Sequence, residues 1–288
     1  MAEASGPTIR ELWSQTAAVV GARNEARWLC EVATALDGAE FVGGLDEQAT
    51  ERMVAHLDAM VARHQAGEPL QYVLGRWGFR RLDLAVDRRV LIPRPETELV
   101  AEAAIELAAA TGPPRLLADL GTGSGAIGLS LAAELPLDGT TVWITDASED
   151  ALAVATSNLP GIGRAARNVR VAHGSWFEAL PPGERFDVIV SNPPYVAEDS
   201  PDLDELVANW EPREALLAGA EGLDAIRELV AGAPEHLVEG GWLVLEIGAH
   251  HGSAVRKLFE QAGFEHIEIR SDLAGRDRIA VGQSLTSS

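Results

Sequence analysis

The apolar positions in the first third of the chain recur at the spacing of amphipathic helices. Residues 8–20 and 23–36 show this period, and a third helix is predicted from Asp46, as its N-cap, to Gly67, which should end it. In residues 72–86 the period changes to an alternation of apolar and polar positions around glycines, which predicts a short β-hairpin. The N-terminal part is therefore predicted to be a small all-helical domain that ends in a hairpin linker.

The rest of the chain alternates between short apolar runs and helical patterns. The segment LIPRPETELV opens a helix with prolines at its start, where a missing N–H costs least. Apolar runs typical of buried strands lie at 116–120, 141–146, 169–174, 186–191 and 241–248, with two further strands expected at 266–270 and 278–282. Helical patterns lie between them, near 125–134, 148–158, 222–238 and 251–262. The alternation implies an α/β fold with a parallel sheet and helices on both faces, and a boundary near residue 85 divides the chain into domains 1–85 and 86–288.

The charge balance narrows the function classes. Acidic residues outnumber basic ones by 44 to 23, which gives a formal charge of −21. This argues against sequence-independent nucleic-acid binding and against an anionic membrane surface, since both depend on Lys and Arg, although residues 63–94 form a local arginine-rich segment. The start of the chain lacks the apolar core of a signal peptide, and no stretch reaches the roughly 20 apolar residues of a membrane span, so we expect a cytoplasmic protein. The single Cys30 excludes a disulfide framework, and no spacing indicates a metal site.

A glycine-rich turn follows the first of these strands, in the segment ADLGTGSGAIG. Gly121, Gly123 and Gly125 permit a tight turn and a close approach of the backbone to a ligand, at the strand end where α/β folds bind ligands. The run GSGAIG matches the dinucleotide-binding pattern, and Asp146, at the end of the next strand, suits the ribose of NAD and of S-adenosylmethionine equally. Asp119 gives the register D-L-G-x-G-x-G, which resembles motif I of class I methyltransferases and favours S-adenosylmethionine.

A second, rigid turn follows the fourth strand at the same edge of the predicted sheet, with the sequence Asn192-Pro193-Pro194-Tyr195. The prolines fix φ, and the Asn192 side-chain oxygen and the Pro193 carbonyl can together accept both hydrogens of an NH2 group. An amide nitrogen is planar and weakly nucleophilic because its lone pair is delocalised, so two acceptors would favour a pyramidal nitrogen whose lone pair points at a methyl donor. Tyr195 would stack on the flat amide or base. The remaining gain in rate would come from positioning the reactants and from desolvating a sulfonium cation.

With both turns identified, the chain resembles the PrmC/HemK family of peptide chain release factor glutamine methyltransferases. The resemblance covers roughly residues 65–282 and rests, in order, on EPLQYVLGRWGF, LIPRPETE, DLGTGSGAI, GSWFEAL, VSNPPYV, WEPREAL, LEIG and DLAGRDRIAVG. NPPY alone also marks amino-methyltransferases that act on adenine. LIPRPETE upstream of motif I is much more specific to the PrmC/HemK family. The first 60 residues fit only the family's general pattern of a small helical domain.

This resemblance implies a class I S-adenosylmethionine-dependent methyltransferase domain, which is Rossmann-like, and methylation of the glutamine side chain in the Gly-Gly-Gln motif of release factors. By position, the cofactor would be bound by Asp119, Gly121, Thr122, Gly123, Ser124, Gly125, Asp146, Trp176 and Asn192. The catalytic residues would be Asn192, Pro193 and Tyr195, which with Pro194 would hold the substrate amide. Residues 1–85 would help to dock the release factor.

Two other functions stay open on the sequence alone. An amino-methyltransferase for adenine or cytosine in nucleic acid would use the same NPPY chemistry, and a non-catalytic dinucleotide sensor or scaffold would use GSGAIG. Arg94 and Glu96 would order the hinge between the domains, touch the cofactor or only form a capped helix start, and Glu246 would face the site or cap its strand. The acidic residues of segment 198–205 are expected to form a solvated loop.

Overall fold

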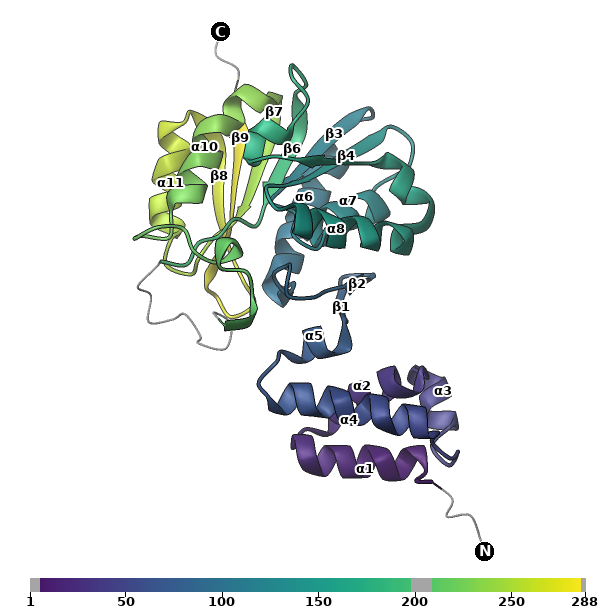
Figure 1. The fold of residues 1–288 in the computed structure, drawn as a ribbon. Helices are drawn as coiled ribbons and strands as arrows, with labels where there is room; N and C mark the ends of the chain where they lie inside the picture. Colours follow the sequence, from purple (N-terminus) through teal and green to yellow (C-terminus); the bar gives the residue numbers. More distant parts are fainter. Residues whose placement is uncertain (1–5, 198–208, 286–288) are drawn as a thin grey trace, which may run out of the picture. The chain divides into compact units, whose positions relative to one another are not determined.

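Two compact units make up the chain, Met1–Arg76 and Trp77–Ser288 (Figure 1). The computed structural model describes residues 6–197 and 209–285, so the acidic segment 198–205 lies outside the described residues. The division falls at residue 76, whereas the sequence pattern placed it near residue 85.

The predicted hairpin accounts for this difference. It consists of β1 (Arg76–Phe79) and β2 (Leu82–Ala85). Ala85 donates its N–H to Asn158 Oδ1 at 2.7 Å, and Asn158 Nδ2 donates back to the Ala85 carbonyl at 3.1 Å and to the Ser124 carbonyl at 2.9 Å. These bonds attach the hairpin to the second unit, beside the glycine-rich turn.

The first unit is helical, as its apolar period predicts. Its helices are α1 (Ile9–Val20), α2 (Arg23–Thr34), α3 (Gly38–Gly43), α4 (Glu51–Gln65) and α5 (Leu70–Leu74). The short α3 and α5 were not predicted, because one or two turns are too few to show a period. The hairpin predicted over residues 72–86 was wrong at residues 72–74, which belong to α5. Asp46 as N-cap was wrong, because α4 begins after Thr50, whose Oγ1 accepts the Met53 N–H at 3.2 Å.

A seven-stranded sheet forms the centre of the second unit, in the strand order β5-β4-β3-β6-β7-β9-β8. The strands are β3 (Arg115–Leu120), β4 (Thr140–Asp146), β5 (Val169–His173), β6 (Phe186–Ser191), β7 (Leu237–Glu246), β8 (Phe264–Ser271) and β9 (Asp277–Ser284). The strands from β3 to β7 pair in parallel, as predicted. β9 pairs antiparallel with β7 and β8, because a short turn rather than a crossover helix joins β8 to β9.

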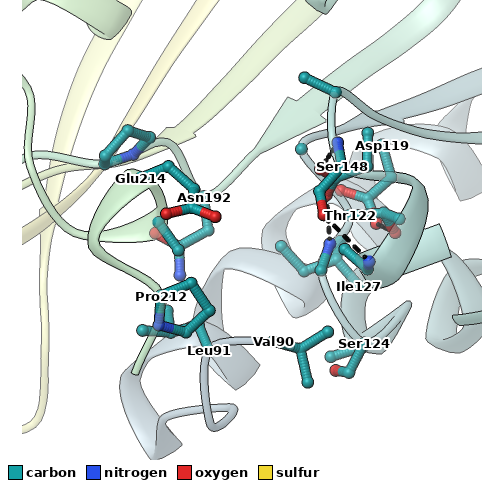
Figure 2. A pocket seen from close by; sticks show the side chains of 18 of the residues that line it. Val90, Leu91, Asp119, Thr122, Ser124, Ile127, Ser148, Asn192, Pro212 and Glu214 are labelled. Atoms are coloured by element: carbon teal, nitrogen blue, oxygen red, sulfur yellow. Dashed lines mark hydrogen bonds between the residues drawn. The ribbon is translucent and has the colours of Figure 1, made fainter. Parts of the chain in front are cut away.

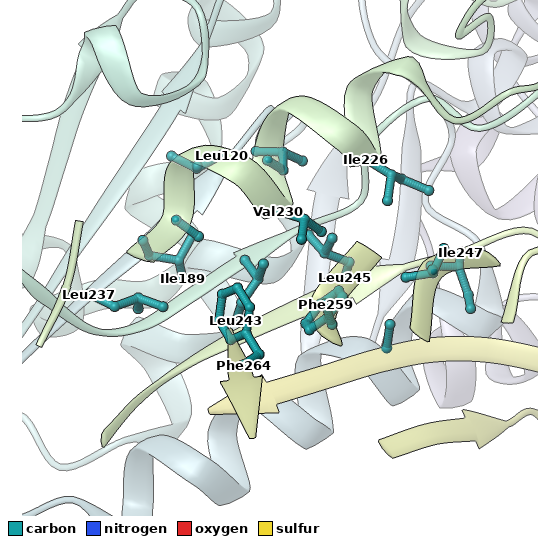
Figure 3. Close-up of a cluster of buried hydrophobic side chains, with 14 of the residues drawn as sticks. Leu120, Ile189, Ile226, Val230, Leu237, Leu243, Leu245, Ile247, Phe259 and Phe264 are labelled. Carbon is teal, nitrogen blue, oxygen red and sulfur yellow. The ribbon is translucent and has the colours of Figure 1, made fainter. Parts of the chain in front are cut away.

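Helices cover both faces of this sheet. They are α6 (Pro95–Ala110), α7 (Ala126–Glu134), α8 (Glu149–Asn158), α10 (Asp224–His236) and α11 (Gly252–Gln261). On one face Leu120 and Leu243 pack with Val230 of α10 and Phe259 of α11 in a buried cluster (Figure 3). On the other face Asp119, which alternates with Leu120 along β3, meets the start of α7. In the described part of the chain, no helix combines the length and apolarity needed to cross a membrane.

The register of the central strands brings the two predicted turns together. Leu120, the last residue of β3, pairs with Thr145 of β4 on one side and with Ser191 of β6 on the other. The residues that come next, Gly121, Asp146 and Asn192, therefore emerge side by side from three adjacent strands. From β3 the strand order continues to β4 and β5 on one side and to β6 and β7 on the other. Open α/β sheets bind their ligands at such a switch in strand order.

Candidate active site

The glycine-rich turn adopts a backbone that requires glycine. Gly121, Gly123 and Gly125 have φ values of 69°, 56° and 86°, in the left-handed region that side chains disfavour. The Thr122 N–H donates to the Thr145 carbonyl at 2.9 Å, which ties the turn to the neighbouring strand. A Cβ built on Gly121 would lie 3.1 Å from the indole of Trp176, so the bare backbone lets the two elements approach closely.

Asp146 links this turn to the loop that follows β4. Its Oδ2 accepts the Gly123 N–H at 2.9 Å, and its Oδ1 accepts the Ser148 N–H at 2.9 Å. Burial raises the pKa of Asp146, and the hydrogen bonds from the backbone partly offset that rise. The carboxylate thereby holds two loops in fixed positions around the end of its strand.

Asp119 lies beneath the same turn and is almost completely buried, with 1% of its surface exposed. Its Oδ2 accepts hydrogen bonds from Thr122 Oγ1 at 2.5 Å and from the Gly128 N–H at 2.8 Å. Its Oδ1 is buried and has no hydrogen-bond partner among the described residues. Burial raises the pKa of Asp119 to about 6. A buried acceptor of this kind calls for a donor from a ligand, because an unsatisfied buried polar atom costs about 1–3 kcal/mol.

A cavity of about 410 Å³ opens at this strand edge. Asn192, Pro212 and Glu214 lie on one side of it, and Asp119 and Thr122 lie on the other (Figure 2). The predicted site residues that line it are Asp119, Gly121, Thr122, Gly123, Ser124, Asp146, Trp176, Asn192 and Pro194. Lining residues that the sequence analysis did not single out are Arg89, Val90, Leu91, Pro93, Thr97, Ala126, Ile127, Ala147, Ser148, Ala151, Ser175, Pro212, Glu214 and Ala215.

Three predicted site residues, Gly125, Pro193 and Tyr195, are not among those that line this cavity. Gly125 is the N-cap of α7, and Pro193 is buried. The Tyr195 hydroxyl donates to Glu246 Oε1 at 3.0 Å, so only the ring of Tyr195 is left to meet a substrate. Burial raises the pKa of the Tyr195 hydroxyl, and the neighbouring Glu246 carboxylate adds to the rise, so the hydroxyl stays protonated.

Glu246, whose role the sequence left open, proves to be fully buried at the end of β7. Its Oε2 accepts a hydrogen bond from Thr97 Oγ1 at 2.6 Å, and Thr97 Oγ1 in turn accepts one from Asn192 Nδ2 at 3.3 Å. Burial raises the pKa of Glu246, while the hydroxyls of Thr97 and Tyr195 counteract the rise. Glu246 thus contacts both ends of the NPPY turn, directly at Tyr195 and through Thr97 at Asn192.

Arg94, whose role was also left open, pairs with Glu211 at the rim of the cavity. Arg94 Nη2 lies 2.5 Å from Glu211 Oε1, and the Ile92 N–H donates to Glu211 Oε2 at 3.0 Å. The pair ties the proline-rich segment before α6 to the segment after residue 210, so that Pro93 and Pro212 line one cavity. WEPREAL was noted as a family segment, but nothing in its spacing assigned this partner to Glu211.

Comparison with known proteins identifies the family. A release factor glutamine methyltransferase of Xylella fastidiosa strain Temecula1 is 47% identical to this chain over 225 residues, which cover 78% of this chain and 80% of the relative. The release factor glutamine methyltransferase of Burkholderia pseudomallei strain K96243 is 41% identical over 262 residues, which cover 90% and 91%. The chain belongs to the release factor glutamine methyltransferase family. The family resemblance read from the motifs is confirmed.

Two family models agree with this membership, and a solved structure shares the fold. Residues 104–209 match the methyltransferase small domain, and residues 15–75 match the PrmC N-terminal domain. A methyltransferase from Pyrococcus furiosus shares the fold, with a TM-score of 0.52 at 17% identity over 80% of this chain and 98% of that one. The predicted class I methyltransferase fold with an N-terminal helical domain is confirmed for this member of the release factor glutamine methyltransferase family.

Proposed function

We propose that the protein transfers a methyl group from S-adenosylmethionine to the side-chain amide nitrogen of the glutamine in the Gly-Gly-Gln motif of peptide chain release factors. The observation that carries this proposal is the placement of Asn192 and the glycine-rich turn at one cavity, at the ends of adjacent parallel strands. The names of the relatives support the choice of substrate. A substrate from the translation machinery places the reaction in the cytoplasm.

The residues of the cavity fit S-adenosylmethionine. The unpartnered Asp119 Oδ1 is suited to a ligand ammonium group, and Asp146 is suited to ribose hydroxyls. Gly121 and Gly123 let the backbone approach a ligand closely. Thr122 and Ser124 complete the same turn, and Gly125 is the N-cap of α7. Trp176, whose ring lies against Gly121, would flank the bound cofactor.

The NPPY turn would hold the glutamine amide. Asn192 Oδ1 and the Pro193 carbonyl would accept its two N–H groups, while Pro194 and the ring of Tyr195 would contact its flat faces. Bound S-adenosylmethionine supplies an electrophilic methyl group on a sulfonium. The two acceptors direct the nitrogen lone pair away from themselves, and the methylated nitrogen loses a proton without a strong base, because it is acidic while it carries positive charge. The chain's contribution is positioning and exclusion of water.

The helical unit would dock the release factor. It carries the match to the PrmC N-terminal domain, over residues 15–75. The residues that line the cavity all belong to the second unit, which leaves the methyl-transfer chemistry to that unit. Neither direct nucleic-acid binding nor a membrane partner forms part of this proposal.

Transfer of an isotopically labelled methyl group tests the proposal against its alternatives. The full-length protein is incubated with labelled S-adenosylmethionine and, in separate reactions, with a release factor, duplex DNA or ribosomal RNA. We expect label in the release factor alone. Label in nucleic acid would favour an amino-methyltransferase of bases, and binding of NADH without binding of S-adenosylmethionine in calorimetry would favour a dinucleotide sensor.

A further inference from the structure

A continuous chain of hydrogen bonds runs behind the NPPY turn. Asn192 Nδ2 lies 3.3 Å from Thr97 Oγ1, and Thr97 Oγ1 lies 2.6 Å from Glu246 Oε2. Tyr195 OH lies 3.0 Å from Glu246 Oε1 and 3.4 Å from Arg278 Nη1. Thr97 and Glu246 are 4% and 1% exposed, so water competes little for these bonds. The five residues come from four parts of the chain: α6, the NPPY turn, β7 and β9.

The hydrogen bonds from Asn192 through Thr97 to Glu246 all run in one direction, from donor to acceptor. The hydrogen bonds from Thr97 and Tyr195 to its two oxygens, and the nearby charge of Arg278, favour the ionised form of Glu246 over the neutral form that burial favours. A hydroxyl has a single hydrogen, and an ionised carboxylate can only accept, so with Glu246 ionised Thr97 donates to it. Thr97 Oγ1 is then free only to accept, and the group of Asn192 that faces it must be the NH2. This assigns the two otherwise interchangeable ends of the Asn192 amide from the bonding pattern. With Nδ2 bound to Thr97, which lines the cavity as Asn192 does, Oδ1 is the end left to accept a hydrogen bond from a ligand in that cavity.

The second oxygen of Glu246 fixes the other end of the turn by the same logic. Tyr195 donates its only hydroxyl hydrogen to Glu246, so its oxygen accepts from Arg278. Arg278 also lies 3.7 Å from Asp272 and brings a positive charge near the buried carboxylate. One carboxylate therefore anchors both the first and the last residue of the four-residue NPPY turn.

We propose that Glu246 is a positioning residue for methyl transfer, which acts through Thr97 to present the Asn192 side chain to the substrate as a hydrogen-bond acceptor. This inference rests on the proposed function, in which the substrate amide offers two N–H donors. Glu246 touches neither substrate nor cofactor in this account. It sets which end of the Asn192 amide faces the cavity, and with that the preference for a substrate nitrogen that carries hydrogens.

Substitutions at Thr97 and Glu246 separate this role from simple packing. Thr97→Val keeps the shape and removes the link, whereas Thr97→Ser keeps the hydroxyl. In Glu246→Gln the new side-chain NH2 can donate to Thr97 Oγ1. The Thr97 hydroxyl is then free to donate to Asn192 Oδ1, and this reverses the Asn192 amide. Thr140→Val is a matched control, because Thr140 is also a buried threonine, 4% exposed, but bonds the Pro136 carbonyl at the opposite end of β4.

Two measurements on the full chain test the proposal. In steady-state kinetics with a release factor, we expect Thr97→Val and Glu246→Gln to lower kcat on the order of 10²-fold, the cost of misplacing a reacting group, with the Kd for S-adenosylmethionine changed less than about threefold. Thr97→Ser and Thr140→Val should stay within about threefold of the unaltered protein in kcat. In NMR, the Asn192 side-chain NH2 resonances, recorded without ligands, should move in Thr97→Val and Glu246→Gln and stay in place in Thr97→Ser and Thr140→Val.

The two readouts fail in different ways. Unchanged Asn192 NH2 resonances in Thr97→Val and Glu246→Gln would overturn the positioning role whether or not the protein methylates release factors. Unchanged kcat in these variants, with an active unaltered protein, would overturn it as well. If the unaltered protein does not methylate a release factor, the proposed function falls, and the resonances alone then decide whether Glu246 orients Asn192. A Thr97→Ser variant as slow as Thr97→Val would point to packing instead.

Discussion

Asp146 and Gly123 are joined by a hydrogen bond of 2.9 Å from the Gly123 N–H to the Asp146 carboxylate. The bond connects the glycine-rich turn after β3 to the end of β4, and both residues line the cavity. One side chain thereby shapes the turn, and under the proposed function it would also accept hydrogen bonds from ribose hydroxyls. Loss of this carboxylate should therefore affect the cofactor before it affects the substrate.

The first prediction concerns Asp146→Ala. Removal of hydrogen bonds to a charged group costs about 1.5–3 kcal/mol, so the Kd for S-adenosylmethionine should rise roughly 10- to 100-fold in calorimetry. The turnover number at saturating cofactor should fall much less. Asp138→Ala is the control, since the Asp138 side chain is fully exposed and lies at the other end of the sheet. An Asp146→Ala variant with normal affinity would remove Asp146 from the ribose role.

The second prediction is a pH dependence of cofactor affinity set by Asp119. Its pKa lies at about 6, above the ordinary 3.8, so the carboxylate protonates as the pH falls through about 6. A cationic ligand group prefers the ionised form, and affinity for S-adenosylmethionine should fall below that pH in calorimetric titrations. Asp119→Asn should bind weakly at neutral pH and lose the step. A step of the same size in Asp119→Asn would assign the pH dependence to another group.

The same raised pKa has a consequence for the stability of the ligand-free protein. Between about pH 4 and 6, Asp119 keeps its proton in the folded state but has lost it in the unfolded state. The free energy of unfolding therefore falls as the pH rises through this window. Asp119→Asn, which removes the buried charge, should have a higher Tm than the unaltered protein at pH 7. At pH 4 the gap between the two Tm values should shrink, and a gap that is equal at both pH values would contradict the account.

The third prediction concerns the Arg94–Glu211 pair. Arg94→Met leaves the Glu211 carboxylate, whose side chain is 2% exposed, with the Ile92 N–H as its remaining bond among the described residues. Because Arg94 itself is one-third exposed, we expect a loss of about 1–3 kcal/mol in the free energy of unfolding by denaturant titration. Arg10→Met breaks a solvent-exposed pair with Asp46 and should cost below about 1 kcal/mol. Equal losses in the two variants would show that burial of Glu211 carries no weight.

The fourth prediction is that methylation stops after one step. Under the proposed function, a primary amide would donate one N–H to Asn192 and one to the Pro193 carbonyl, whereas the methylated product retains a single N–H. Binding of the product nitrogen would leave one acceptor unsatisfied. Prolonged incubation with excess S-adenosylmethionine should therefore add one methyl group per glutamine, as judged by peptide mass spectrometry. A substantial dimethylated fraction would show that the two acceptors are not used together.

Residues that follow strand ends could be predicted from the sequence, because strand ends are local features. Asp119, Gly121, Asp146 and Asn192 were all placed at one edge of a parallel sheet, and the structure brings them to one cavity. Their grouping needs only the rule that the carboxyl ends of parallel strands share an edge. The residues that we propose bind the cofactor could thus be grouped from motifs and their spacing.

The support behind the site could not be predicted in this way. Thr97 and Glu246 are 149 residues apart, and Ile92 and Glu211 are 119 apart, so their contacts depend on how α6 packs on the sheet. No local pattern encodes such a partner, and the sequence could not decide whether Glu246 faces the site or caps its strand. The antiparallel placement of β9 between β7 and β8 carries Arg278 to the same spot, and the sequence alone showed two strands without their pairing.

The central claim is tested most directly by mapping the methyl group on a release factor with the unaltered protein and with Asn192→Ala. Peptide mass spectrometry after incubation with S-adenosylmethionine should place one added CH2 unit on the glutamine of Gly-Gly-Gln. Asn192→Ala should slow this modification by raising its activation free energy by about 3–4 kcal/mol, with cofactor affinity nearly unchanged. An unmodified glutamine under conditions of confirmed cofactor binding, or an Asn192→Ala variant of normal rate, would contradict the account.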